Sequence, residues 1–213
     1  MRCSKETMLL YAVTDRSWVK EQTFYEQVES ALKGGVTCVQ LREKDLSEED
    51  FLEEALAIRA LCHDYGVPFL INDNVELAIK CGADGVHVGQ KDMEAGHVRS
   101  LVGDEMIIGV SAQTVEQAVR AQEAGADYLG VGAVFSTSTK ADAMDVSHET
   151  LRKICESVSI PVVAIGGINR NNIMELSGSG ICGVALVSAI FASKDIEDEC
   201  RMLKKLSSEM IKV

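Results

Sequence analysis

One short phrase recurs along this chain: a glycine that ends a helical pattern is followed at once by an apolar, strand-like run. It occurs at Gly35, Gly82, Gly125 and Gly180. Glycine ends helices because it enters the left-handed backbone region at little steric cost. Between these points the pattern gives eight strand–helix units with short connections in 213 residues. We therefore predict a (β/α)8 TIM barrel, a fold of the α/β class, that uses residues 1–213 as a single domain.

The expected strands and helices follow from apolar runs and cap signals. Helical patterns are expected over 24–33, from Ser47, from Thr114 in a Thr-x-x-Gln capping box, from Ser147, after Gly167 and around 196–210. The alternative fold is a doubly wound open sheet. It is disfavoured because no Gly-x-Gly-x-x-Gly motif follows the first strand. Strands are expected over 8–14, 36–39, 68–71, 83–88, 106–110, 127–131, 161–165 and 182–187.

Charge and composition limit the partners. The net charge of −12 argues against nucleic acid and against an anionic membrane. No apolar run reaches transmembrane length and the N-terminus has no signal-peptide pattern, so we expect a cytoplasmic protein. The seven cysteines form no Cys-x-x-Cys pair and several lie within apolar patterns, which predicts small buried hydrophobic residues. Whether the chain forms a homo-oligomer is left open.

The stretch from Val39 to Asp45 is the first candidate for a binding site. In an extended chain alternate residues share a face, so Gln40, Arg42 and Lys44 point one way and Leu41 and Glu43 point the other way. An amide, a guanidinium and an ammonium group on one face suit an anion. Taken alone, the stretch also fits an edge strand with solvated charges.

Further polar residues follow the other expected strands. In such barrels the active site lies at the carboxyl ends of the strands. Gly166 and Gly167 would let the backbone approach a phosphate. The positive groups exceed what one phosphate needs, which predicts a second anion such as a diphosphate. The candidates at these strand ends are Asn72, Asp73, Asp92, Ser111, Thr137, Ser138, Thr139, Lys140, Gly166, Gly167, Val187 and Ser188.

Asp73 and Asp92 are candidate magnesium ligands. Mg²⁺ commonly takes one or two protein carboxylates together with phosphate oxygens and water. The alternative for each is an aspartate that caps a helix. His87 lies within an expected strand and is interpreted as a core histidine, whereas His63, His97 and His148 are expected on helices in solvent.

Eight short phrases occur in order along nearly the whole chain: Tyr11-Ala-Val-Thr-Asp15, Gln40-Leu-Arg-Glu-Lys44, Ile71-Asn-Asp73, Gly85-Val-His-Val-Gly-Gln90 with Asp92, Gly109-Val-Ser111, Thr137-Ser-Thr-Lys140, Ile165-Gly-Gly-Ile168 and Val187-Ser188. In these phrases the chain resembles the thiamine-phosphate synthase family. The resemblance implies a (β/α)8 transferase that uses Mg²⁺ and small phosphorylated substrates. It would join 4-amino-2-methyl-5-(diphosphooxymethyl)pyrimidine to 4-methyl-5-(2-phosphooxyethyl)thiazole and release diphosphate. Ser136 stands where the family often has proline.

The resemblance also implies a role for each matching position. It gives Mg²⁺ to Asp73 and Asp92, and catalysis to Arg42, Lys44, Ser111 and Lys140. The pyrimidine diphosphate would bind Gln40, Leu41, Arg42, Glu43, Lys44, Asn72, Ser111 and Lys140, and the thiazole phosphate would bind Thr137, Thr139, Gly167, Val187 and Ser188, with Ser138 also in the substrate-binding set.

Two alternatives within the fold remain. The related thiazole tautomerases use a histidine shortly after the fifth strand, where this chain has Ser111-Ala112-Gln113-Thr114. A non-catalytic regulatory paralogue would be expected to lack a metal aspartate or part of the basic set, and this chain lacks neither. The segment 135–145 carries residues for both substrates, and we expect it to close over them as a lid.

Overall fold

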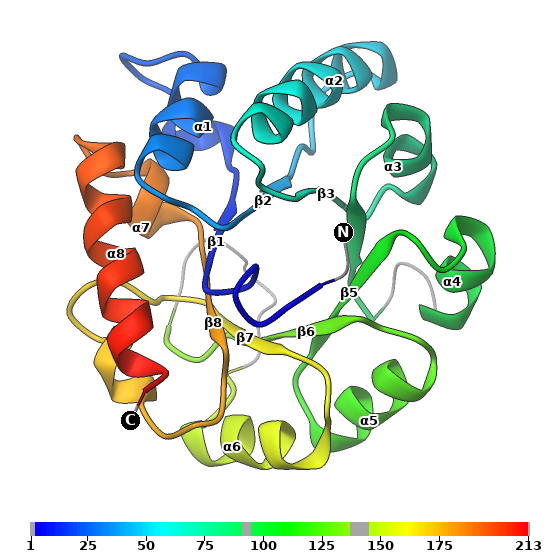
Figure 1. Ribbon diagram of the computed structural model, residues 1–213, viewed down its shortest axis with the longest axis vertical. Helices are drawn as coiled ribbons and strands as arrows, with labels where there is room; N and C mark the ends of the chain where they lie inside the picture. The colour runs from blue at the N-terminus through cyan, green and yellow to red at the C-terminus, as the bar shows by residue number, and fades with distance from the viewer. Residues whose placement is uncertain (1–2, 91–94, 137–144, 213) are drawn as a thin grey trace.

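The computed structural model describes residues 3–90, 95–136 and 145–212 of the chain. Eight parallel strands form a closed barrel in which each strand pairs with the next and β8 pairs with β1. Helices surround the barrel, as Figure 1 shows. This architecture confirms the predicted (β/α)8 fold. The strands are β1 (Leu10–Val13), β2 (Cys38–Leu41), β3 (Phe69–Asn72), β4 (Gly85–Val88), β5 (Ile107–Ala112), β6 (Tyr128–Val131), β7 (Val162–Ile165) and β8 (Gly183–Leu186).

The helices alternate with these strands along the chain. Most begin at a side-chain cap, because the first N–H groups of a helix have no partner within it. The helices are α1 (Phe24–Lys33), α2 (Glu48–Asp64), α3 (Val75–Cys81), α4 (Ala95–Val102), α5 (Val115–Glu123), α6 (His148–Ser157), α7 (Ser188–Phe191) and α8 (Ile196–Met210), with 3-10 turns η1 (Arg16–Trp18) and η2 (Ile173–Leu176).

The predicted caps are present. Ser47, Thr114 and Ser147 each accept a hydrogen bond from the backbone N–H three residues later. At Thr114 the box is incomplete, because the Gln117 side chain accepts from the N–H of Gln113 instead. A complete capping box that the pattern did not reveal joins Thr23 and Glu26 at the start of α1.

Two layers of apolar side chains stabilise the barrel. The larger layer lies between the strands and the helices and includes Leu41 and Val86. A smaller cluster fills the barrel interior and includes Tyr11, Leu70 and Tyr128. The alternation follows from the two-residue period of a strand, which sends successive side chains to opposite faces. The interior is therefore closed by packing, and ligands can reach only its ends.

The structure differs from the local predictions in two places. β2 ends at Leu41, so Arg42, Glu43 and Lys44 lie in the loop after it, beyond the strand on which the predicted alternation was based. The helix expected after Gly167 is only the 3-10 turn η2. The residues before this turn bond locally, since the Asn172 side chain accepts from the N–H of Asn169, and the side-chain amides of both asparagines donate to the carbonyl of Gly167. Such side-chain bonds compete with helix formation.

The cysteines behave as packing residues. All seven are free thiols, and five of them are buried. Burial raises the pKa of Cys62 and Cys200 to about 12. In the described part of the chain no helix is long and apolar enough to cross a membrane.

Candidate active site

The end of β2 is tied to the end of β1 by a run of hydrogen bonds. The N–H of Thr14 donates to the carbonyl of Gln40, and the Thr14 hydroxyl accepts from the N–H of Arg42, both at 3.0 Å. Asp15 then lies 3.5 Å from the Arg42 guanidinium, and both side chains are largely shielded from solvent. The loop after β1 therefore sets the position of Arg42 at the mouth of the barrel.

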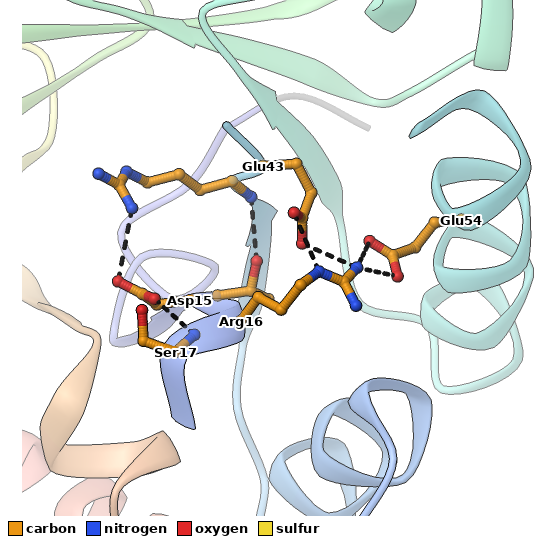
Figure 2. Close-up of polar contacts among 7 residues, drawn as sticks. Asp15, Arg16, Ser17, Glu43 and Glu54 are labelled. Carbon is orange, nitrogen blue, oxygen red and sulfur yellow. Dashed lines mark hydrogen bonds and ion pairs between the residues drawn. The ribbon is translucent and has the colours of Figure 1, made fainter. Parts of the chain in front are cut away.

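The next residue of this loop belongs to a separate cluster. Glu43 accepts from Arg16 at 3.2 Å, and its side chain is only 3% exposed. Arg16 also contacts Glu54 of α2 at 2.7 Å, so it lies between two carboxylates (Figure 2). The expectation that Glu43 points away from Arg42 agrees with this arrangement. The Glu43 carboxylate is engaged by Arg16, and the Leu41 side chain is in the outer core, so a ligand would meet these two residues through their backbone groups.

Asn72 and Asp73 lie at the end of β3. The Asn72 amide donates to the Asp73 carboxylate at 2.6 Å, and the N–H of Asp73 donates to the carbonyl of His87. Asp73 has a positive φ of 62°, a conformation uncommon for residues other than glycine. The cap of α3 is Asn74, which accepts from the N–H of Leu77. The helix-cap alternative for Asp73 is therefore wrong, and its carboxylate is exposed at the barrel rim.

Ser111 lies in β5, where it is held from the neighbouring strand. His87 of β4 places Nε2 3.0 Å from the Ser111 hydroxyl and Nδ1 2.8 Å from the hydroxyl of Tyr128. Gln90 donates to the Ser111 carbonyl at 2.7 Å. The interpretation of His87 as a hydrogen-bonded inner histidine is confirmed, and it directly contacts a candidate site residue.

The ends of β7 and β8 form the opposite side of the rim. Gly166 and Gly167 have φ of 98° and 66°, which an L side chain adopts only with strain. A Cβ atom on Gly167 would lie 2.6 Å from the carbonyl oxygen of Ser136 and 2.8 Å from that of Phe135. Gly167 therefore packs its backbone against the start of the segment after β6. Val187 and Ser188, both half-buried, follow β8 directly.

Known proteins match this chain along nearly its whole length. A family model described as thiamine monophosphate synthase matches residues 10–190. The chain belongs to the thiamine-phosphate synthase family. A thiamine-phosphate synthase of Ruminiclostridium cellulolyticum is 51% identical over 203 residues, which cover 95% of this chain and 97% of the relative. One of Clostridioides difficile is 49% identical over 195 residues, covering 92% and 93%.

Solved structures of the thiamine-phosphate synthase family agree. A thiamine phosphate pyrophosphorylase from Pyrococcus furiosus superposes with a TM-score of 0.90 at 38% identity, covering 97% of this chain and 98% of that one. The resemblance drawn from the sequence, and with it the predicted synthase activity, is confirmed. The chain is thus an enzyme of a transferase family.

In this member of the thiamine-phosphate synthase family, the candidate site residues that the structure describes lie at one end of the barrel, because parallel strands end at the same rim. Their roles toward a ligand stay predictions. Lys44 is exposed in the loop after β2. The remaining candidates lie outside the described residues: Asp92, Thr137, Ser138, Thr139 and Lys140, together with most of the expected lid.

Sequence reasoning did not assign a role to four residues that hold the site. Thr14 and Asp15 position the Arg42 loop, while Tyr11 and Tyr128 contact Gln40 and His87. A signal was present for three of them, because the phrase Tyr11-Ala-Val-Thr-Asp15 was among the family matches. Tyr128 carried no signal, because an aromatic residue in an apolar strand is typical of a core.

Proposed function

We propose that this chain makes thiamine phosphate from two phosphorylated substrates in the presence of Mg²⁺. The observation that carries the proposal is the division of the barrel rim into two sides. Gln40, Arg42, Asn72, Asp73 and Ser111 come from β2 to β5, and the glycines and Ser188 come from β7 and β8. We assign the first side to the pyrimidine diphosphate and the second to the thiazole phosphate. Lys140 and Thr137 to Thr139 complete this assignment as sequence predictions.

Asp73 fits a hard divalent cation. Its carboxylate is exposed at the rim, it is oriented by the Asn72 amide, and it does not cap the following helix. Oxygen ligands of this kind suit Mg²⁺, which usually keeps several waters and phosphate oxygens in its shell. Asp73 with Asp92 would hold the ion. When bound, the ion would supply Lewis-acid stabilisation of negative charge on the diphosphate.

The protein's own residues stabilise the departure of diphosphate. Arg42, held by Asp15, and Lys44 place positive charge where the leaving group gains negative charge, which preorganises the site. The bond from the pyrimidine methylene carbon to the diphosphate oxygen breaks, and the oxygen keeps the electron pair. The thiazole nitrogen donates its lone pair to the same carbon and has no proton to lose. No general base is needed.

Exclusion of water matters more than proton transfer in this reaction, because water would attack the same carbon. The closely packed barrel interior protects the site from below. The tautomerase alternative is not supported by His87, since both of its ring nitrogens already meet protein hydroxyl groups. Small phosphorylated molecules are thus the proposed partners, and the cytoplasm is the proposed location.

The direct test is to mix both substrates with the purified chain and Mg²⁺ and to measure thiamine phosphate and diphosphate together. We expect the two products in equal amounts, with turnover lost on chelation and restored by Mg²⁺. Ser188→Ala should raise the KM for the thiazole phosphate, whereas Arg42→Ala should raise the KM for the pyrimidine diphosphate. Diphosphate release without thiamine phosphate would identify a hydrolase and contradict the proposal.

A further inference from the structure

A continuous chain of hydrogen bonds crosses the barrel interior beneath the proposed site. Gln40 Nε2 lies 2.6 Å from the Tyr11 hydroxyl, and the two tyrosine hydroxyls are 2.8 Å apart. From Tyr128 the chain continues to His87 and ends at the Ser111 hydroxyl, over 2.8 Å and 3.0 Å. It starts at one candidate substrate residue and ends at another, and joins strands β2, β1, β6, β4 and β5.

Gln40, Tyr11 and Tyr128 are buried and depend on one another for hydrogen bonds, whereas His87 and Ser111 are half-buried. Tyr11 is 1% exposed, Tyr128 0% and Gln40 4%. A buried polar group without a partner destabilises the fold, so such a network is stable only when every buried member is satisfied. Burial raises the pKa of both tyrosines well above the ordinary value, so both hydroxyls keep their protons. Each hydroxyl has one proton and can donate only once.

These constraints leave two directions for the hydrogen-bond chain. In the first, the Gln40 amide N–H donates to Tyr11, and the Tyr11 proton is donated to Tyr128. The Tyr128 proton then goes to Nδ1 of His87, which must be unprotonated there. The His87 proton is therefore on Nε2 and is donated to Ser111. The Ser111 hydroxyl, having accepted this bond, directs its own proton to an acceptor outside the chain.

In the reverse direction Tyr128 would donate to Tyr11, and Ser111 would donate inward to His87. The Tyr11 proton would then go to the carbonyl of a turned Gln40 amide or to the Cys38 thiol, which Tyr11 also hydrogen-bonds. Ser111 would then present only lone pairs to a ligand, which repel an anionic oxygen. A diphosphate beside Ser111 selects the first direction.

The neighbouring strands leave space for the chain. A Cβ atom on Gly109 of β5 would overlap the ring of Tyr128, and one on Gly130 of β6 would lie 3.1 Å from Cε1 of His87. The strand register pairs Gly109 with Tyr128 and Ser111 with Gly130. The rings of Tyr128 and His87 therefore fit in the interior because the strand positions beside them are glycines.

We propose that Tyr11, Tyr128 and His87 are positioning residues that act through this oriented chain. It holds the Ser111 hydroxyl as a donor toward the diphosphate. At its other end it leaves the Gln40 carbonyl oxygen as an acceptor, suited to an amino group such as that of the pyrimidine. The ligand assignment and the choice of direction rest on the proposed function, whereas the hydrogen-bonded contacts do not.

The orientation is tested by the tautomer of His87, read from the ¹⁵N NMR spectrum of histidine-labelled protein without substrates. His63, His97 and His148 are exposed on helices, so the inner histidine should be distinguishable from them. We expect a neutral ring with the proton on Nε2 in the wild type. Tyr128→Phe should abolish this preference, and Tyr11→Phe, which removes the donor to the Tyr128 hydroxyl, should weaken it. A ring protonated on Nδ1, or the same tautomer in all three proteins, would overturn the inference.

The positioning role is tested by kinetics of the same variants. Tyr128→Phe should lower kcat/KM for the pyrimidine diphosphate about tenfold, with the KM for the thiazole phosphate changed less than twofold. Ile107→Val, which trims an interior side chain outside the chain of hydrogen bonds, controls for a general loss of packing. Equal effects of these two variants would refute the role.

A backup variant covers the case in which Tyr128→Phe does not fold. Gly130→Ala keeps every hydrogen-bonding group but pushes on His87, and it should give the same substrate-selective loss. Unchanged kinetics in Gly130→Ala would then count against the role. If the wild type makes no thiamine phosphate, the proposed function fails. The tautomer of His87 still decides whether the chain of hydrogen bonds has the proposed direction.

Discussion

Gly167→Ala tests how closely the two sides of the rim depend on the backbone after β7. The residue has a φ of 66°, so a Cβ atom adds strain of about 1–2 kcal/mol. The same atom would lie 2.6 Å from the Ser136 carbonyl oxygen and 2.8 Å from that of Phe135. Those partners are backbone atoms, which cannot rotate away as a side-chain tip would. Overpacking of this kind costs about 1–3 kcal/mol more, so we expect a total loss of about 2–5 kcal/mol.

Gly66→Ala is the matched control for Gly167→Ala. Gly66 also has a φ of 66°, but a Cβ atom there would meet nothing within 4 Å. It should therefore lose only the strain, about 1–2 kcal/mol. Urea unfolding of both variants and the wild type gives the two free energies, provided that the dependence on urea concentration is unchanged.

The activity of the same two variants separates the site from the fold. Gly167→Ala displaces the start of the segment that is predicted to carry thiazole-phosphate ligands, so the KM for that substrate should rise about tenfold, equivalent to about 1.4 kcal/mol. The KM for the pyrimidine diphosphate should change little, and Gly66→Ala should leave both constants as in the wild type. If Gly167→Ala costs no more stability than Gly66→Ala, the crowding seen at this turn has no energetic meaning. A larger residue such as valine would disturb the turn too much to report on the phosphate alone.

Three further predictions follow from the described contacts. Asp73→Asn keeps a residue that tolerates a positive φ, and it should lower turnover at least tenfold and remove the Mg²⁺-dependent rise in thermal stability; an unchanged Mg²⁺ response would contradict the metal assignment. Asp15→Asn weakens the ion pair with Arg42 and should raise the KM for the pyrimidine diphosphate about threefold, whereas Arg42→Ala should raise it about tenfold. Equal effects of the two variants would show that Asp15 does more than orient Arg42. Burial raises the pKa of the Cys62 and Cys200 thiols from 9.0 to about 12, so both should resist alkylation at pH 8 until the chain unfolds, and rapid alkylation of the folded chain would contradict this. The free energy of unfolding should also fall as the pH rises from about 9 toward 12, because the thiols of the unfolded chain lose their protons first.

Much of the fold could be predicted because its signals are local. Each apolar run that reads as a strand is bounded by glycine or by a cap, and the caps at Ser47, Thr114 and Ser147 formed where the pattern put them. The repeated alternation then leaves few ways to cover a parallel sheet on both faces, and a closed barrel is one of them. The candidate site followed from the same rule, since the ends of parallel strands share one rim.

The failures occurred where a side chain outcompeted the local pattern. The asparagines after Gly167 form their own hydrogen bonds, so η2 replaces the expected helix. β2 ends before Arg42, whose place is set by Thr14 and Asp15 from another loop. No property of residues 40–44 alone could reveal that support, because it depends on the pairing of β1 with β2.

The sequence by itself determined the order of the elements, the family and the chemical types present at the strand ends, because each of these resides in neighbouring residues or in short motifs. Only the tertiary structure decided which groups work together. Tyr11 and Tyr128 are separated by 117 residues, yet their hydroxyl groups are 2.8 Å apart and join Gln40 to His87. The physical reason is that closing the barrel brings distant strands face to face across its interior, where burial forces every polar group to find a partner.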